Sequence, residues 1–181
     1  MAHNINFNEQ TGRHSFFSVQ KKAWHNLGQI VEQYPTSEEA IIHAGLDYEV
    51  EKSSLFTKGS GIIETAESIE IGSSELEVPN YFANIRTDNN AVLGVVGKDY
   101  HIVQNREAFN FFDAIVGGGE GILYETAGAL GQGERIFITA KLPDYIRVGN
   151  GDDVTEKYIF LTTSHDGSGS ITAVFGGLLL P

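Results

Sequence analysis

The sequence predicts an α+β domain that is mainly antiparallel sheet built from hairpins. One main amphipathic helix packs on the sheet, and a second short helix lies near the N-terminus. Alternating apolar and polar stretches recur along the chain, separated by turn formers that include many of its 21 glycines. Only two segments combine helical periodicity with a recognisable start and stop. Short strands with two clear helices favour this class over a doubly wound parallel fold.

The first residues form a mixed, polar stretch, which we interpret as an N-terminal arm over 1–22. Trp24, the only tryptophan, follows this arm and stands beside His25. Because an indole ring can bury a large apolar area, we expect Trp24 to anchor the arm on the core.

The short helix is predicted to begin after Thr36. Thr36 and Glu39 have the spacing of a capping box, and Gly45 is a natural stop after Ala44. The residues over 46–51 then alternate between apolar and acidic side chains, as in a half-buried strand.

Glycine and serine turns divide the next region into short predicted strands, around 62–63, 69–71 and 76–78. A central hairpin follows, with strands near 81–86 and 92–96 on either side of an Asp-Asn-Asn turn.

The main helix is predicted over 106–116, with Asn105 as its N-cap. Ala108, Phe109 and Phe112 fall on one face of this helix. After it, 135–142 alternates cleanly as a strand. An Asp-Gly turn then separates strand-like residues at 158–163 and 171–175 and predicts a hairpin. We therefore expect a single domain over 23–175 and a tail over 176–181.

Composition limits the function classes. The formal net charge is −12, with 24 acidic and 12 basic residues spread along the chain. This balance disfavours binding to an anionic membrane and weakens the case for a free nucleic-acid binder. The absence of cysteine excludes disulfides, thiolate zinc sites and cysteine nucleophiles. With no signal-peptide pattern and no apolar run of membrane-spanning length, the expected location is the cytoplasm.

His165 and Asp166 are the candidate catalytic residues, and they suggest a hydrolase-like enzyme as an alternative function. The same residues are explained by turn formation, which we favour because catalytic partners normally converge from separate parts of a fold. The glycine-rich stretches 117–121 and 128–133 are interpreted as turns, since they lack the features of phosphate loops. No cofactor and no metal site is expected, because the histidines do not have paired metal-ligand spacing.

The candidate binding residues surround the polar segment that leads into the main helix. A helix start with a nearby arginine can hold an anion or a backbone phosphate. Capping by Asn105, with Arg106 in solvent, is the simpler interpretation. The candidates are Arg86, Lys98, Tyr100, His101, Gln104, Asn105 and Arg106.

Seven short motifs, in order, carry a family resemblance: WHNLG (24–28), AGLDYEV (44–50), RTDN (86–89), LGVVGKDY (93–100), VQN (103–105), ETAGAL (125–130) and TSHDGS (163–168). Together they resemble the phage/plasmid-like proteins grouped under domain of unknown function 932. Family members look as though they continue beyond this chain's last residue, so we expect a C-terminally shortened domain.

The resemblance implies a mobile-element context. We expect a non-enzymatic accessory of DNA metabolism, with single-stranded nucleic-acid binding by the full-length form. A protein-interaction module that acts on a host factor is the alternative partner hypothesis, and a homo-oligomer is left open.

Overall fold

The structure, a computed structural model, describes residues 4–64, 69–116, 123–147 and 154–179. Its largest unit is a six-stranded sheet in the order β11-β10-β9-β8-β3-β4. All neighbours in this sheet are antiparallel except β3 and β4, which are parallel. The strands are β3 (Phe16–Val19), β4 (Gln29–Val31), β8 (Leu123–Leu130), β9 (Arg135–Arg147), β10 (Val154–Ser164) and β11 (Thr172–Leu179).

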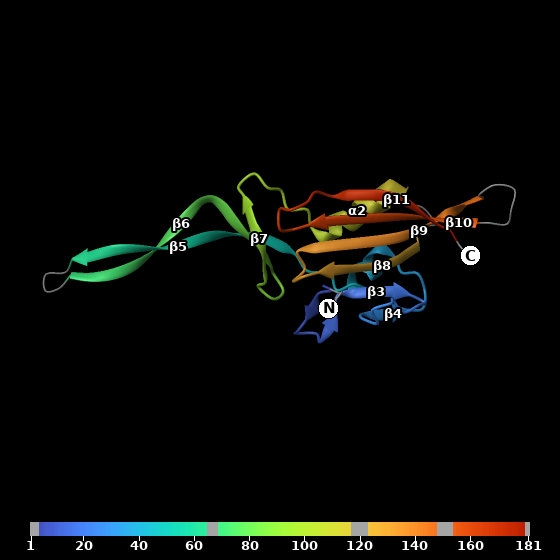
Figure 1. The fold of residues 1–181 in the computed structure, drawn as a ribbon, viewed down its shortest axis with the longest axis horizontal. Helices are drawn as coiled ribbons and strands as arrows, with labels where there is room; N and C mark the ends of the chain where they lie inside the picture. Colours follow the sequence, from blue (N-terminus) through green and yellow to red (C-terminus); the bar gives the residue numbers. More distant parts are fainter. Residues whose placement is uncertain (1–3, 65–68, 117–122, 148–153, 180–181) are drawn as a thin grey trace.

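Two helices, α1 (Ser37–His43) and α2 (Asn105–Val116), pack on one face of this sheet, and α2 lies behind the strands in the view of Figure 1. Strand alternation explains why that face is apolar. Ile136, Ile138 and Ala140 point inward along β9 and are fully buried. The prediction of an α+β fold with mostly antiparallel sheet and two helices is confirmed.

The short helix has the predicted capping box. The Thr36 Oγ1 atom accepts a hydrogen bond from the Glu39 backbone N–H at 3.3 Å, and Glu39 Oε2 accepts one from the Thr36 N–H at 2.9 Å. These bonds satisfy donors that the first turn would leave unpaired. The residues after the helix alternate as expected, with Leu46, Tyr48 and Val50 buried.

A second, three-stranded sheet contains β5 (Val50–Glu64), β6 (Ile69–Arg86) and β7 (Val92–Gly97). The strands β5 and β6 form a long ribbon that projects away from the six-stranded sheet (Figure 1). We refer to residues 51–64 and 69–80 as the ribbon. β7 pairs with β6 only over 81–85, and this pairing confirms the predicted central hairpin.

The prediction of several short strands in the ribbon is wrong. Glycine and serine residues that were expected to form turns lie within the ladder instead, where Gly59 pairs with Ser74 and Gly61 with Gly72. These residues pair with one another across the two strands, so the backbone pairing continues where turns were expected. A smaller hairpin of β1 (Phe7–Asn8) and β2 (Arg13–His14) completes the fold.

Trp24 is not the predicted buried anchor, because 75% of its surface is exposed. Phe16 and Phe17 on β3 fill the interior instead, and part of the expected N-terminal arm therefore belongs to the main sheet. The Trp24 indole lies edge-on to His25, whose ring packs against Phe16 at 4.7 Å between centroids.

The Asp-Gly hairpin between β10 and β11 is confirmed. Gly167 has φ +78°, and the Asp166 carboxylate accepts a hydrogen bond from the Ser168 N–H at 2.8 Å. In the part of the chain that the structure describes, no helix is long and apolar enough to cross a membrane.

Candidate functional site

Several of the residues singled out in the sequence meet inside the protein, where the two sheets join. We call this set the buried polar network. Each member is at most 5% exposed, although each carries a polar or charged group. The members are Tyr48, Asn84, Arg86, Asn105 and His165.

His165 and Asn105 form the inner pair of the network. The Asn105 amide donates to the Leu46 carbonyl at 3.0 Å, so its oxygen is the acceptor of the 2.8 Å contact with His165 Nε2. This arrangement assigns the proton to Nε2. Burial lowers the pKa of His165 to about 4, so the ring is neutral near pH 7.

The prediction that Asn105 caps the main helix is therefore wrong, because its side chain is used in the interior. Gln104 occupies the capping position instead. Its carbonyl accepts from the Ala108 N–H at 3.1 Å, and its own N–H donates to the Glu107 carboxylate at 2.8 Å.

Arg86 is the charged member of the network and has no exposed surface. Its guanidinium lies 3.7 Å from the centroid of the Tyr48 ring and donates to both carboxylate oxygens of Asp88, at 2.9 and 2.7 Å. Its Nη1 atom donates to the Gln132 carbonyl at 2.8 Å. Bidentate pairing and stacking compensate the cost of burying this cation.

The network links the two sheets. The Tyr48 hydroxyl donates to the Gly133 carbonyl at 2.7 Å, and burial raises the pKa of Tyr48 to about 12. The Asn84 amide donates to the His165 carbonyl at 2.6 Å. A side chain at Gly133, where φ is +109°, would meet Arg86 Nη1 at 2.6 Å. These contacts give the motif residues an architectural role.

The candidate catalytic pair does not converge as a nucleophile and its base would. The His165 ring is fully buried, whereas the Asp166 carboxylate is bound to the turn that follows it. A general base must come within hydrogen-bond reach of a substrate proton. The enclosed position of His165 does not provide such access.

The candidate binding residues separate into two groups. Arg86, Tyr100, Gln104 and Asn105 are engaged within the protein: the Tyr100 hydroxyl donates to the Ser164 carbonyl at 2.8 Å, and the Gln104 amide bonds the Val50 backbone twice. The remaining candidates are exposed, namely Lys98, His101 and Arg106. The seven residues thus do not share one surface.

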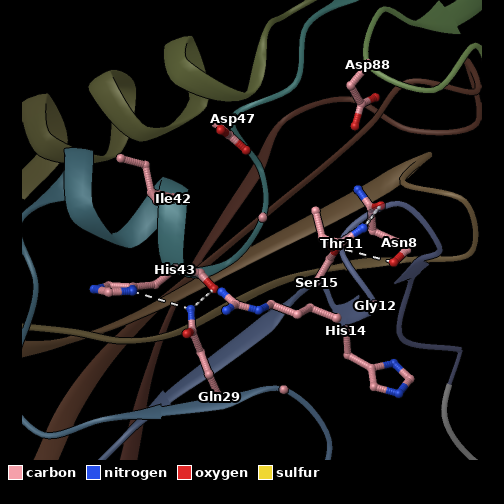
Figure 2. Close-up of a pocket in the computed structure, with 13 residues that line it drawn as sticks. Asn8, Thr11, Gly12, His14, Ser15, Gln29, Ile42, His43, Asp47 and Asp88 are labelled. Carbon is pink, nitrogen blue, oxygen red and sulfur yellow. Dashed lines mark hydrogen bonds between the residues drawn. The ribbon is translucent and has the colours of Figure 1, made fainter.

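A cavity of about 590 Å³ lies between the small β1–β2 hairpin and the end of α1 (Figure 2). Figure 2 shows Asp47 and Asp88 on one side of this cavity and Gln29 with His43 on the other. The Gln29 amide contacts both the ring and the carbonyl of His43. The lining residues are Asn8, Thr11, Gly12, Arg13, His14, Ser15, Gly28, Gln29, Ile42, His43, Gly45, Asp47 and Asp88.

The polar lining of this cavity does not amount to a metal centre. Within the described ranges, no group of three or more His, Cys, Asp or Glu side chains is placed to hold a metal ion. Asp88 already balances the charge of Arg86. Sequence reasoning did not identify this cavity, because its walls come from segments without a shared motif.

The second surface feature is the side of the six-stranded sheet that faces away from the helices. Strand alternation and cross-strand register place Phe137, Thr139, Phe160, Thr162 and Val174 on this side, and we call this set the open sheet face. The rings of Phe137 and Phe160 are stacked with centroids 6.5 Å apart. Phe160 is 40% exposed and Val174 52% exposed.

A pocket of about 390 Å³ lies at one end of the open sheet face, and we call it the hydroxyl pocket. Six of its eight lining residues are serine or threonine, one is an arginine, and none is acidic. They are Arg135, Thr162, Thr163, Ser164, Ser168, Gly169, Ser170 and Thr172. A signal for it was present in the sequence, because the Ser-rich hairpin turn follows a Thr-rich strand.

A family model described as Domain of unknown function (DUF932) matches residues 92–178, which run from β7 to β11. No curated protein and no solved structure matches the chain. The matched segment contains Asn105 and His165 of the buried polar network, both sides of the hydroxyl pocket and the open sheet face. The resemblance seen in the sequence motifs is thereby confirmed: the chain contains a DUF932 domain over residues 92–178.

Proposed function

We propose that this protein is a non-enzymatic accessory of mobile-element DNA metabolism, and that it binds single-stranded nucleic acid on the open sheet face. The observation that carries the proposal is the stacked pair of a half-buried Phe137 and a 40% exposed Phe160 on a face that neither helix covers. Aromatic side chains on an open sheet face offer a stacking platform for unpaired bases.

The surroundings of the aromatic pair suit a nucleic-acid strand. Thr139 and Thr162 flank the rings at the same level of the sheet, and Thr139 offers a hydroxyl group, whereas the Thr162 hydroxyl donates to the Ile136 carbonyl. Arg135 lies on the same side, one alternation beyond Phe137 along β9, and its side chain is 55% exposed. Stacking tolerates any base sequence, because every base presents a π face.

Overall acidity predicts that this binding is weak and sensitive to salt. The net charge of −12 repels phosphates at long range, and Lys141 on the same face is paired with Glu156. Local contacts must therefore supply most of the affinity. The electrostatic attraction between Arg135 and a phosphate weakens as the salt concentration rises.

The buried polar network supports the non-enzymatic part of the proposal. Asn105 bonds His165 and the Leu46 carbonyl, and Arg86 bonds Asp88 and the Gln132 carbonyl. Because the Arg86, Asn105 and His165 side chains are buried, the motifs that contain them have a structural role. The mobile-element context rests on the motif resemblance alone.

A binding measurement with the full chain tests the proposal. Fluorescence anisotropy of a labelled thymidine oligonucleotide should show binding at about 50 mM salt and clearly weaker binding at about 200 mM salt. Phe160→Ala should reduce affinity by roughly fivefold or more, because stacking contributes about 1–3 kcal/mol per base.

Phe56→Ala is the matched control, since Phe56 is a similarly exposed phenylalanine on the ribbon, 59% accessible. It should leave the affinity unchanged. Absence of binding at the lower salt concentration, or equal losses in the two variants, would contradict the proposal.

The projecting ribbon favours a second candidate function, a protein-interaction module that acts on a host factor. Phe56, Leu76 and Tyr81 are exposed along β5 and β6. The sequence over 51–80 has six glutamates and two lysines, which suits a basic partner surface. Under this alternative, shortening the ribbon abolishes association with the partner but leaves oligonucleotide binding intact.

A further inference from the structure

We propose that the hydroxyl pocket binds the phosphate group of a nucleotide whose base stacks on Phe137 and Phe160. This inference rests on the proposed function and deepens it by assigning a phosphate site to one end of the open sheet face. Neither the family description nor the sequence motifs point to Arg135.

Arg135 supplies the positive charge of the pocket. Its Nη2 atom donates a hydrogen bond to Ser168 Oγ at 3.1 Å, and its side chain remains largely exposed. A guanidinium has five N–H donors in a planar fork that matches a phosphate group. In the described part of the chain, Arg135 uses few of these donors, so the others remain available to a ligand.

A serine hydroxyl extends the donor set. Ser168 Oγ accepts from Arg135, and its own hydroxyl bonds the Asp166 carboxylate. Ser170 lines the same pocket, and its carbonyl is the acceptor for the Thr172 hydroxyl at 3.4 Å. The pocket thus combines a cation with a hydroxyl donor, a set that proteins use for oxyanions.

The frame of the pocket is fixed by internal hydrogen bonds. Ser164 Oγ accepts from the Gly169 N–H at 2.9 Å and lies 3.2 Å from the Gly169 carbonyl, to which it donates. The Thr162 hydroxyl donates to the Ile136 carbonyl at 2.9 Å. These contacts hold the turn against β10, so the ligand-binding groups are preorganised.

Asp166 brings a carboxylate close to this site. Its Oδ2 atom lies 3.6 Å from Arg135 Nε, which is longer than a hydrogen bond. Burial opposes ionisation of Asp166, but hydrogen bonds from the side chain and backbone of Ser168 and the charge of Arg135 leave its pKa below the ordinary value. The charged carboxylate forms an ion pair with Arg135 Nε and therefore lowers the affinity of the pocket for anions, but it does not contact the Nη atoms.

The spacing between the pocket and the aromatic pair fits one nucleotide. Thr162 lines the pocket and pairs in register with Phe137, while Phe160 is its neighbour on the same face of β10. Alternate residues of a strand lie about 7 Å apart, comparable to the separation of a base from its phosphate. A strand that stacks on the rings can therefore place a phosphate beside Arg135.

The test uses the full chain with thymidine monophosphate, inorganic phosphate and thymidine as three separate probes, measured by ligand-detected NMR. Arg135→Ala should weaken thymidine monophosphate binding by about tenfold, since charge-assisted hydrogen bonds are the strong ones. Asp166→Asn should tighten it. Thymidine, which lacks the phosphate, should bind the wild-type and Arg135→Ala proteins equally.

Arg106→Ala is the matched control because Arg106 is an exposed arginine on α2, and it should change nothing. Arg135→Lys, which keeps the charge but loses the fork, should give an intermediate affinity. Unchanged circular dichroism of each variant confirms that the fold is retained.

The outcomes separate this inference from the proposed function. Oligonucleotide binding that depends on Phe160 but not on Arg135 would overturn the phosphate site and leave the proposed function standing. Arg135-dependent binding of thymidine monophosphate without oligonucleotide binding would support the site and remove the proposed function. Binding of inorganic phosphate as tight as that of thymidine monophosphate would overturn the base-stacking part of the inference.

Discussion

At the scale of single residues, His165 shows how a buried polar side chain is held neutral. Burial has the largest effect on its pKa, and the nearby Arg86 charge lowers it further, while Asp166 acts in the opposite direction. The Nδ1 atom has no hydrogen-bond partner among the described residues, so the ring depends on the single contact between Nε2 and Asn105. A proton added to this ring would enter a buried site beside a cation.

His165 therefore predicts a loss of stability in mild acid. Its folded-state pKa of about 4 lies below the ordinary value of 6.5, so between these values the unfolded chain takes up a proton that the native protein does not. From pH 6.5 down to pH 4, the free energy of unfolding should fall by up to about 1.4 kcal/mol per pH unit from this residue.

Urea denaturation across this pH range measures the effect. His165→Gln keeps a donor for Asn105 but cannot titrate, and its stability should fall less steeply with decreasing pH. His101→Gln, at an exposed histidine, should follow the wild-type curve. Identical slopes for His165→Gln and the wild type would contradict the assignment.

At the scale of elements, β7 packs closely against the hairpin turn after β10. A Cβ atom added at Gly94 would lie 2.6 Å from the Asp166 Cα atom, which belongs to the backbone and cannot move aside cheaply. The neighbouring Gly97, on the same strand, has no atom within 4 Å of such a Cβ. Glycine at position 94 is therefore required by packing, whereas glycine at 97 is not.

The variant Gly94→Ala should lower the free energy of unfolding by about 1–3 kcal/mol, the usual cost of inserting a methyl group into a tight contact. Gly97→Ala should stay within about 0.5 kcal/mol of the wild type. Urea titrations of both variants provide the comparison. A neutral Gly94→Ala would show that the two sheets can separate without cost.

The elements that the sequence predicts correctly are those fixed by local interactions. The capping box of Thr36 and Glu39 needs only residues three apart, and the Asp166–Gly167 turn needs only its own backbone. Asn105 had an equally good local explanation, but its side chain is taken by His165, 60 residues further along the chain. No local pattern could reveal that competition.

At the scale of the whole molecule, the protein is a covered sheet with a ribbon projecting from it (Figure 1). The central pairing of β3 with β8 joins Phe16 to Gly128, which periodicity cannot predict because it depends on contacts distant in sequence. The open sheet face could be read only after register had placed Phe137 and Phe160 side by side. The position of the candidate site thus depends on the strand order and register more than on any sequence motif.

The ribbon should be dispensable for folding. Thr57 and Leu76 are paired in register, so replacing residues 58–75 by Asn-Gly closes a short hairpin without disturbing the rest of β5 and β6. The thermal midpoint should change by less than about 4 °C, the shift that about 1 kcal/mol produces in a chain of this size.

Calorimetry measures this change, and oligonucleotide anisotropy of the same variant distinguishes the two candidate functions. Retained oligonucleotide binding supports the open sheet face as the binding surface. Loss of cooperative unfolding would instead show that the ribbon stabilises the body of the protein.

The exposed position of Trp24 has a spectroscopic consequence. As the only tryptophan, it should account for nearly all of the long-wavelength fluorescence of the protein, and because 75% of its surface is exposed, we expect its emission to resemble that of an unfolded chain. Emission wavelength is therefore a poor indicator of denaturation here. The same indole lies beside the His25–Phe16 contact at the β3 side of the sheet. Quenching of its fluorescence by added nucleotides therefore offers a label-free signal of nucleotide contact with this surface.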